Sequence, residues 1–208
     1  MRAEPTCPRC GSPLAAPGLR SSAWACPLHG AVSPLQPIPP LTPQAVITAA
    51  RASGVPVWVP WPLPPAWLVT GVRQVGDERG PARAVALAVS GPAPLGGVAD
   101  LILVAEEPGI GLGARFAGLD AADPGRGFDA GPPAAKVEVS GHPCALWEVA
   151  GAADRSAFVG EAAGCWLWAV VWPETAGLVV HDRLALLDLR DPGRSLDLPF
   201  GAPSPRLA

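Results

Sequence analysis

The sequence predicts an α+β fold in two parts: a small N-terminal cysteine module, then an antiparallel β-sheet domain with one or two helices. Three observations support this. Cysteine and histidine recur at short, regular spacings before residue 30, and a proline-rich stretch follows them. Short runs rich in Val, Ile and Leu fill most of the remaining chain. These runs do not alternate regularly with helical patterns, so a doubly wound parallel sheet is not expected.

The composition limits the class of protein. A chain of 208 residues suits a small module plus one domain of ordinary size. Hydrophobic residues make up 49% and charged residues 16%, which allows a sizeable core, yet no apolar run reaches the roughly 18 residues of a membrane span. The net charge is −3 and Lys136 is the single lysine, so the sequence carries no strong signal for nucleic-acid binding, which depends on clustered Lys and Arg.

The N-terminal module contains two hooks of the form Cys-x-x-ligand. Cys7 and Cys10 form the first, Cys26 and His29 form the second, and fifteen residues separate Cys10 from Cys26. This spacing is typical of a zinc ribbon. Because four ligands of type Cys3His close a tetrahedral shell, we predict a structural Zn²⁺. Iron is the main rival metal, and a redox Cys-x-x-Cys pair is the main rival function.

The other two cysteines, Cys144 and Cys165, lie in apolar surroundings and are expected to be small buried hydrophobes. The N-terminus lacks the apolar segment of a secretory signal peptide. Thiolate ligands also persist best in a reducing compartment, so we expect a cytoplasmic protein.

The domain boundaries follow the prolines. The chain divides into a zinc ribbon (1–35), a proline-rich linker (36–43), an antiparallel α+β domain (44–190) and a proline-rich tail (191–208). Thr42 is a good N-cap and Pro43 a good first helical residue, while Gly54 is a good stop. A helix is therefore predicted over 43–53.

The segment 55–67 alternates tryptophan with proline and must run extended, because its prolines exclude a helix or a central strand. Trp58 and Trp61 can pack into the core of the following sheet or form an exposed surface for a partner. Eight segments after this one have strand patterns, from which we expect an antiparallel sheet of five to seven strands, and a short helix is possible over 154–163. The predicted strands are 68–75, 83–89, 100–105, 136–139, 145–149, 165–172, 178–180 and 184–189.

The stretch 108–135 has no strand pattern, and long loops inside compact domains are often functional. It begins with Gly109, Gly111 and Gly113, whose spacing differs from that of a dinucleotide-binding loop. Glu106 and Glu107 precede it and are a possible acid–base pair, although consecutive residues of a strand point to opposite faces.

Trp166 and Trp168 are two residues apart and so share one face of a predicted strand. Together with Trp58 or Trp61 they can form a tryptophan-rich core or an aromatic pocket.

The motifs in order are Cys-Pro-Arg-Cys-Gly, Cys-Pro-Leu-His-Gly, the Trp/Pro segment 55–64, Glu-Glu-Pro-Gly-Ile-Gly-Leu-Gly-Ala, and the segment 166–177. Over nearly the whole chain they resemble an uncharacterised family of short actinobacterial proteins with an N-terminal zinc ribbon and a Trp/Pro-rich domain. Some members carry the label phosphotransacetylase, but the sequence has no basic pocket for acetyl phosphate and is short for that enzyme.

We therefore expect a zinc-binding cytoplasmic protein that is not an enzyme and that binds a partner protein or a small apolar ligand. The possible binding surface comprises Trp58, Trp61, Glu106, Glu107, Gly109, Gly111, Gly113, Trp166 and Trp168. The alternative is an enzyme with an acidic pocket at Glu106 and Glu107 beside the loop 109–113. That alternative requires the two carboxylates to converge on one site.

Overall fold

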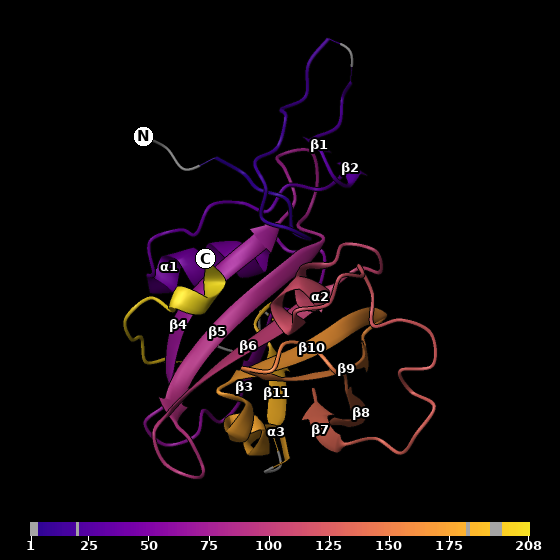
Figure 1. Ribbon diagram of the computed structural model, residues 1–208. Helices are drawn as coiled ribbons and strands as arrows, with labels where there is room; N and C mark the ends of the chain where they lie inside the picture. The colour runs from indigo at the N-terminus through magenta and orange to yellow at the C-terminus, as the bar shows by residue number, and fades with distance from the viewer. Residues whose placement is uncertain (1–3, 20, 182–183, 192–196) are drawn as a thin grey trace.

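One large curved sheet organises the chain, and the N-terminal segment projects from one end of it (Figure 1). The computed structural model describes residues 4–19, 21–181, 184–191 and 197–208. Its elements are β1 (Ala25–Cys26), β2 (Gly30–Ala31), α1 (Pro43–Arg51), β3 (Trp58–Pro60), β4 (Leu68–Val75), β5 (Ala84–Pro92), β6 (Val98–Glu106), α2 (Leu112–Ala117), β7 (Ala135–Val139), β8 (His142–Glu148), β9 (Ser156–Ala162), β10 (Cys165–Trp172), the 3₁₀ turn η1 (Glu174–Gly177), α3 (Leu178–His181), β11 (Ala185–Asp188) and the 3₁₀ turn η2 (Pro205–Leu207).

The main sheet has nine strands among the described residues, in the order β3-β11-β7-β8-β9-β10-β6-β5-β4. All neighbouring pairs are antiparallel except β11 and β7. The predicted antiparallel sheet is confirmed in character, but it has more strands than the five to seven expected. β3 accounts for part of the difference, since the proline-rich segment does contribute a strand, at the edge of the sheet where proline is tolerated.

The predicted first helix is confirmed as α1, which ends two residues earlier than expected. The Thr42 side chain accepts a hydrogen bond from the Ala45 amide, and Pro43 occupies the first turn. Val46, Ala49 and Ala50 form the buried face of α1.

Two secondary-structure predictions are wrong. Most of 154–163 is strand β9, not a helix, because it is joined to β10 by a two-residue turn: Ala163 and Gly164 both have positive φ, as a tight hairpin requires. The predicted strand 178–180 lies in α3. The stretch 108–135 also holds one short helix, α2.

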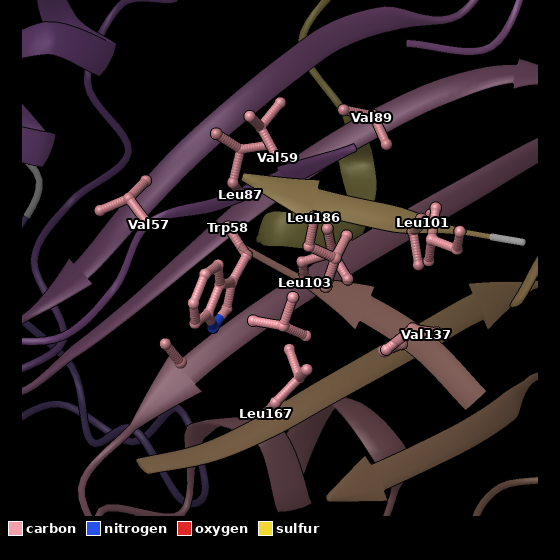
Figure 2. Close-up of a cluster of buried hydrophobic side chains, with 14 of the residues drawn as sticks. Val57, Trp58, Val59, Leu87, Val89, Leu101, Leu103, Val137, Leu167 and Leu186 are labelled. Carbon is pink, nitrogen blue, oxygen red and sulfur yellow. The ribbon is translucent and has the colours of Figure 1, made fainter. Parts of the chain in front are cut away.

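Both faces of the central strands are buried, because their residues alternate between two apolar clusters. On one face, Leu87, Leu103 and Leu167 pack with Trp58 of β3 (Figure 2). On the other face, small residues of β5 and the large side chain of Trp168 pack against α2. Strands buried on both faces read as continuous apolar runs, which explains the unbroken Val-, Ile- and Leu-rich segments of the sequence.

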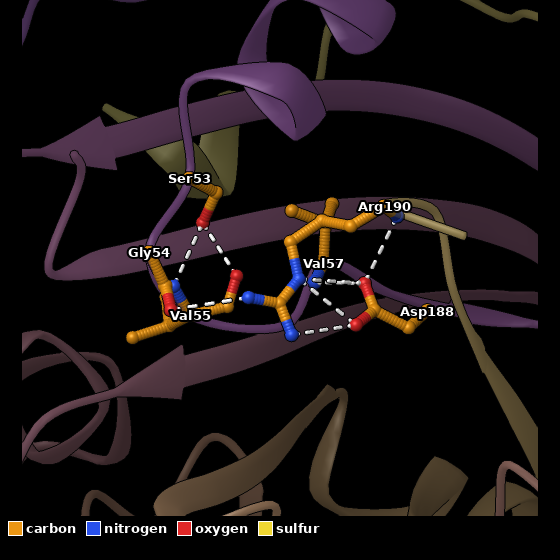
Figure 3. A network of polar contacts seen from close by, with 6 residues as sticks. All are labelled: Ser53, Gly54, Val55, Val57, Asp188 and Arg190. Atoms are coloured by element: carbon orange, nitrogen blue, oxygen red, sulfur yellow. Dashed lines mark hydrogen bonds and ion pairs between the residues drawn. The ribbon is translucent and has the colours of Figure 1, made fainter. Parts of the chain in front are cut away.

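The Trp/Pro segment is fastened at its start by a polar network (Figure 3). The Val57 amide donates to Asp188 Oδ1 at 3.0 Å, and Arg190 binds Asp188 while also donating to the Gly54 carbonyl. Burial opposes the charge on Asp188, but the bonds from Arg190 and Val57 outweigh it and lower the pKa of Asp188. The network fixes the register at which β3 lies beside β11.

Candidate metal centre

The N-terminal module (residues 4–35, described except for residue 20) has little regular structure. The second hook forms the turn of a two-stranded hairpin of β1 and β2, and Gly11 and Gly30 each adopt positive φ just after a hook. Backbone amides of Arg9 and Cys10 point at the Cys7 sulfur. These two glycines therefore let the backbone turn at the end of each hook.

The two hooks bring Cys7, Cys10, Cys26 and His29 together, and one ligand atom from each lies within 4.8 Å of all the others. The Cys7 and Cys26 sulfurs are 3.5 and 3.6 Å from His29 Nδ1, and the Cys10 and Cys26 sulfurs are 3.7 Å apart. Tetrahedral Zn²⁺ with ordinary bond lengths places two sulfurs ~3.8 Å apart and sulfur and nitrogen ~3.5 Å apart. These separations fit a four-coordinate metal bound through His29 Nδ1, and 3.7 Å is far too long for a disulfide.

The cysteines differ in how readily they lose a proton. Burial raises the pKa of Cys7 to about 11, against the amides that point at its sulfur. Burial acts the same way on Cys10, but the hydroxyl and amide of Ser12 and the neighbouring thiols outweigh it and lower its pKa to about 6. Without metal the group therefore combines one thiol that ionises readily with one that does not, and a bound cation would favour the thiolate form of both.

The module is attached to the sheet by backbone and arginine contacts. Gln36 and Gly76 amides donate to the Gln74 and Pro34 carbonyls, which joins the end of the module to β4. Arg9 donates to the carbonyls of Gly109 and Ile110, reaching from the first hook to the glycine loop.

Two arginines of the connection between β4 and β5 reach in the opposite direction. Arg79 donates to the carbonyl of Ser22, and Arg83 donates to the hydroxyl of Ser33. The module and the sheet domain thus each contribute polar groups to the contact between them.

The two neighbouring glutamates do not converge. Glu106 is fully buried, and its carboxylate accepts hydrogen bonds from the amides of Leu112 and Gly113 at 2.7 and 3.2 Å. Glu107 is exposed and pairs with Arg83 at 2.7 Å. The acid–base pocket of the alternative prediction is therefore not formed, because consecutive strand residues point to opposite sides.

Burial raises the pKa of Glu106 to about 7, although the amides of Leu112 and Gly113 oppose this. The Trp168 indole N–H lies near the carboxylate and also favours its charged form, at a geometry short of a full hydrogen bond. Glu106 thus holds the start of α2 rather than facing a substrate.

The three glycines of the loop each serve packing. Gly113 lies against the Trp168 ring, where any side chain would collide with the indole. Gly111 has positive φ and lies close to Arg9, and the Gly109 amide donates to Asp123 at 2.8 Å.

The tryptophans are separated by the sheet. Trp58 is 3% exposed and belongs to one apolar cluster, whereas Trp168 is fully buried in the other. Trp166 is half-buried on the same face as Trp168, and its indole donates to Asp123. The idea that Trp58 extends a surface made by Trp166 and Trp168 is therefore wrong, because Trp58 lies on the opposite face.

Trp61 is half-buried and lines an apolar cavity of about 450 Å³ with several prolines and Val179.

Several residues beside the centre carry no sequence signal. Arg115 of α2 and Arg73 of β4 both lie beneath the module, and Asp123 fastens the loop after α2 to Trp166. Arg115 and Asp123 come from the patternless stretch 108–135, where spacing gives no indication of a partner. The alternation of β4 indicates that Arg73 lies on one face, but not that the face is covered by the module.

Comparison with known proteins places the whole chain in one family. No curated protein and no solved structure matches it. Within the described part of the chain, every helix is too short or too polar to cross a membrane. The model of a family of unknown function (DUF6758) matches residues 1–207, so the chain belongs to that family.

Proposed function

We propose that this protein is a zinc-binding, non-enzymatic binding protein of the cytoplasm, in which Zn²⁺ folds the N-terminal module as a zinc ribbon. The observation that carries the proposal is the convergence of Cys7, Cys10, Cys26 and His29 within 4.8 Å of one another, with three separations of 3.5–3.7 Å that match edges of a zinc tetrahedron. Soft thiolates with one imidazole favour zinc over the harder divalent cations.

The role of the metal follows from the ligand set. Bound Zn²⁺ would supply folding free energy to a segment that has few buried apolar side chains of its own. Four protein ligands leave no coordination position for water or substrate, which supports a structural role rather than a catalytic one.

The test is metal analysis of the purified chain by plasma mass spectrometry, with a Cys7→Ser/Cys26→Ser variant. We expect one zinc per chain, lost in the variant. The control is Cys144→Ser/Cys165→Ser, which removes two buried cysteines outside the cluster and should keep the full zinc content. Replacement by Co²⁺ should give the absorption of a tetrahedral thiolate site. Freshly reduced protein without metal would refute the zinc site.

The binding half of the proposal concerns the cavity at Trp61. Trp61 and Trp67 border it together with Pro62, Pro64 and Pro92, so its wall is made of indole and pyrrolidine rings. Grooves of this composition bind extended proline-rich segments, which lose little conformational entropy on binding. We therefore propose a partner protein that presents such a segment.

A fluorescent decaproline peptide is a suitable probe for this cavity. We expect its anisotropy to rise with the native chain and not with Trp61→Ala, whereas Trp147→Ala, a half-buried tryptophan away from the cavity, should behave as the native chain. No response from the native chain, or an equal response from both variants, would refute the proline-rich partner. Quenching of Trp61 by a small apolar dye in that case would favour the small-ligand alternative.

A further inference from the structure

Arg115 lies directly against the metal-binding hooks. It belongs to α2, whose first amides are held by the buried Glu106, and a side chain placed at Gly11 would begin 2.8 Å from the Arg115 Nη2 atom. Gly11 follows Cys10 immediately, so the guanidinium reaches the first hook from the body of the protein.

The charge of Arg115 has no carboxylate partner. Among the described residues, no Asp or Glu lies within ion-pair distance of it, and its buried Nη1 atom has no hydrogen-bond partner at all. An unpaired, desolvated guanidinium group is costly. Burial lowers the pKa of Arg115, and the charges that act in the opposite direction are those of Cys10 and Cys7.

A second guanidinium increases the positive charge at the same place. Arg73 is 7% exposed and donates to the carbonyls of Gln36 and Leu207 and to the Thr6 hydroxyl, all uncharged groups. Burial, and then the positive charge of Arg115, lower its pKa to about 10. Two cations that repel each other thus lie beneath the module, and neither forms an ion pair with an Asp or Glu in the described part of the chain. Zinc held by three thiolates and a neutral imidazole carries about one net negative charge, which would offset one of these two positive charges.

We propose that Arg115 is a positioning residue of the metal centre: once the metal is bound, its guanidinium donates N–H···S hydrogen bonds to the Cys7 and Cys10 thiolates and balances the charge of the loaded site. This inference rests on the proposed zinc site. Arg115 would also connect the metal to the sheet, because it belongs to α2, and the first amides of α2 donate to Glu106 of β6. Groups that hydrogen-bond to metal ligands typically change metal affinity by about 10–100-fold.

The test is the zinc affinity of Arg115→Met and Arg115→Lys, measured by competition with a chromophoric chelator. We expect Arg115→Met to bind zinc about 10–100-fold more weakly and Arg115→Lys to fall between it and the native chain. The control is Arg79→Met, which removes another arginine that contacts the module but lies away from the thiolates, and should stay within about threefold of the native chain.

Spectroscopy separates a sulfur contact from a general loss of packing. In the Co²⁺-loaded protein, loss of N–H···S bonds should move the sulfur-to-metal charge-transfer band to longer wavelength in Arg115→Met and leave it unmoved in Arg79→Met. An unchanged band together with unchanged affinity in a folded Arg115→Met would overturn the inference while leaving the zinc site intact.

A measurement on the native chain covers the case in which Arg115→Met does not fold. With ¹¹³Cd²⁺ in place of zinc, an Arg115 guanidinium proton bonded to a ligand sulfur should show scalar coupling to the metal. Absence of this coupling in a fully loaded sample would refute the hydrogen bond. A native chain that takes up no metal would instead refute the zinc site itself, and the inference with it.

Discussion

The N-terminal module and the sheet obtain their order from different sources. Among the described residues of the module, the buried side chains are Pro8, Pro34, Leu35 and two cysteines of the Cys3His cluster, Cys7 and Cys26. In the sheet, β5, β6 and β10 bury side chains on both faces in two extensive clusters. With the proposed Zn²⁺ bound, the module would depend on four ligand atoms, whereas the sheet depends on apolar area removed from water. On this proposal, one region of the chain is stabilised by a few strong bonds and the other by many weak contacts.

The contacts between the two regions are mostly polar. Arg9 binds carbonyls of the glycine loop, while Arg79 and Arg83 bind polar groups of the module. Leu35 is the exception, since it joins the apolar cluster that contains Trp168. Polar contacts orient the module on the sheet but contribute little folding free energy, so the two regions should respond separately to perturbation.

Removal of the metal should produce the largest difference in behaviour between the two regions. After treatment with a chelator, we expect residues 4–34 to exchange their amide protons at unfolded-chain rates, because about 10–16 kcal/mol of metal-binding free energy is lost. Amides of β5, β6 and β10 should keep their protection. Hydrogen exchange followed by mass spectrometry of peptides measures both regions in one sample. Equal loss of protection throughout the chain would show that the sheet also depends on the metal.

A cavity created by mutation in the core of the sheet should lower the stability of the sheet and leave the module unaffected. Leu167 is fully buried beside Leu103, so Leu167→Ala should lower the free energy of unfolding of the sheet by about 2–5 kcal/mol in urea denaturation. Zinc affinity should remain unchanged, since the metal ligands are all in the module. The matched control is Leu28→Ala, a leucine of the module that is 73% exposed and should have almost no effect. A weaker zinc site in Leu167→Ala would contradict the separation of the regions.

The two regions also differ in how well the sequence predicts them. The hooks can be predicted because metal ligands need a fixed residue type at a fixed spacing, and the structure brings the four predicted ligand residues together. Thr42 and Pro43 marked the start of α1 for a similar reason, since a helix cap is a local requirement. Such features depend on neighbours in the sequence and survive in any fold.

What the sequence did not predict depends on distant partners. The segment of β9 is predicted as a helix from its local pattern, but its pairing with β10 and β8 overrides that propensity and makes it a strand. No local pattern indicates a role for Arg115, because Cys7 and Cys10, the groups whose charges act on it, lie about a hundred residues earlier in the chain. The opposite positions of Trp58 and Trp168 follow from the curvature and order of the whole sheet, which no local pattern encodes.

The buried Glu106 should give the sheet a distinctive dependence on pH. Its pKa is raised by burial from an ordinary 4.5 to about 7, so between these values the native state holds a proton that the unfolded state releases. The free energy of unfolding should therefore fall as the pH rises from about 4.5 to about 7 and then level off, by on the order of 3 kcal/mol. The zinc ligands act in the opposite direction because they must be deprotonated to bind.

Glu106→Gln isolates this contribution, since it keeps the shape of the side chain and does not titrate. The stability difference between the native chain and Glu106→Gln, measured in urea at a series of pH values, should favour the native chain most at low pH and decline toward pH 8. A constant difference across this range would contradict a raised pKa for Glu106.

The neighbouring Glu107 should give the smallest effect. Its carboxylate pairs with Arg83 at the surface, with 43% of its side chain and 49% of that of Arg83 exposed. Exposed pairs contribute about 0–1 kcal/mol, so Glu107→Gln should change the free energy of unfolding by less than 1 kcal/mol, and 1 M salt should abolish the difference. Arg83 also contacts Ser33 of the module, so a loss well above that value, with faster amide exchange in residues 31–34, would show that this surface pair orients the module. A loss within the expected range would mean that two adjacent glutamates, indistinguishable in the sequence, differ because one is enclosed by α2 and the other faces solvent.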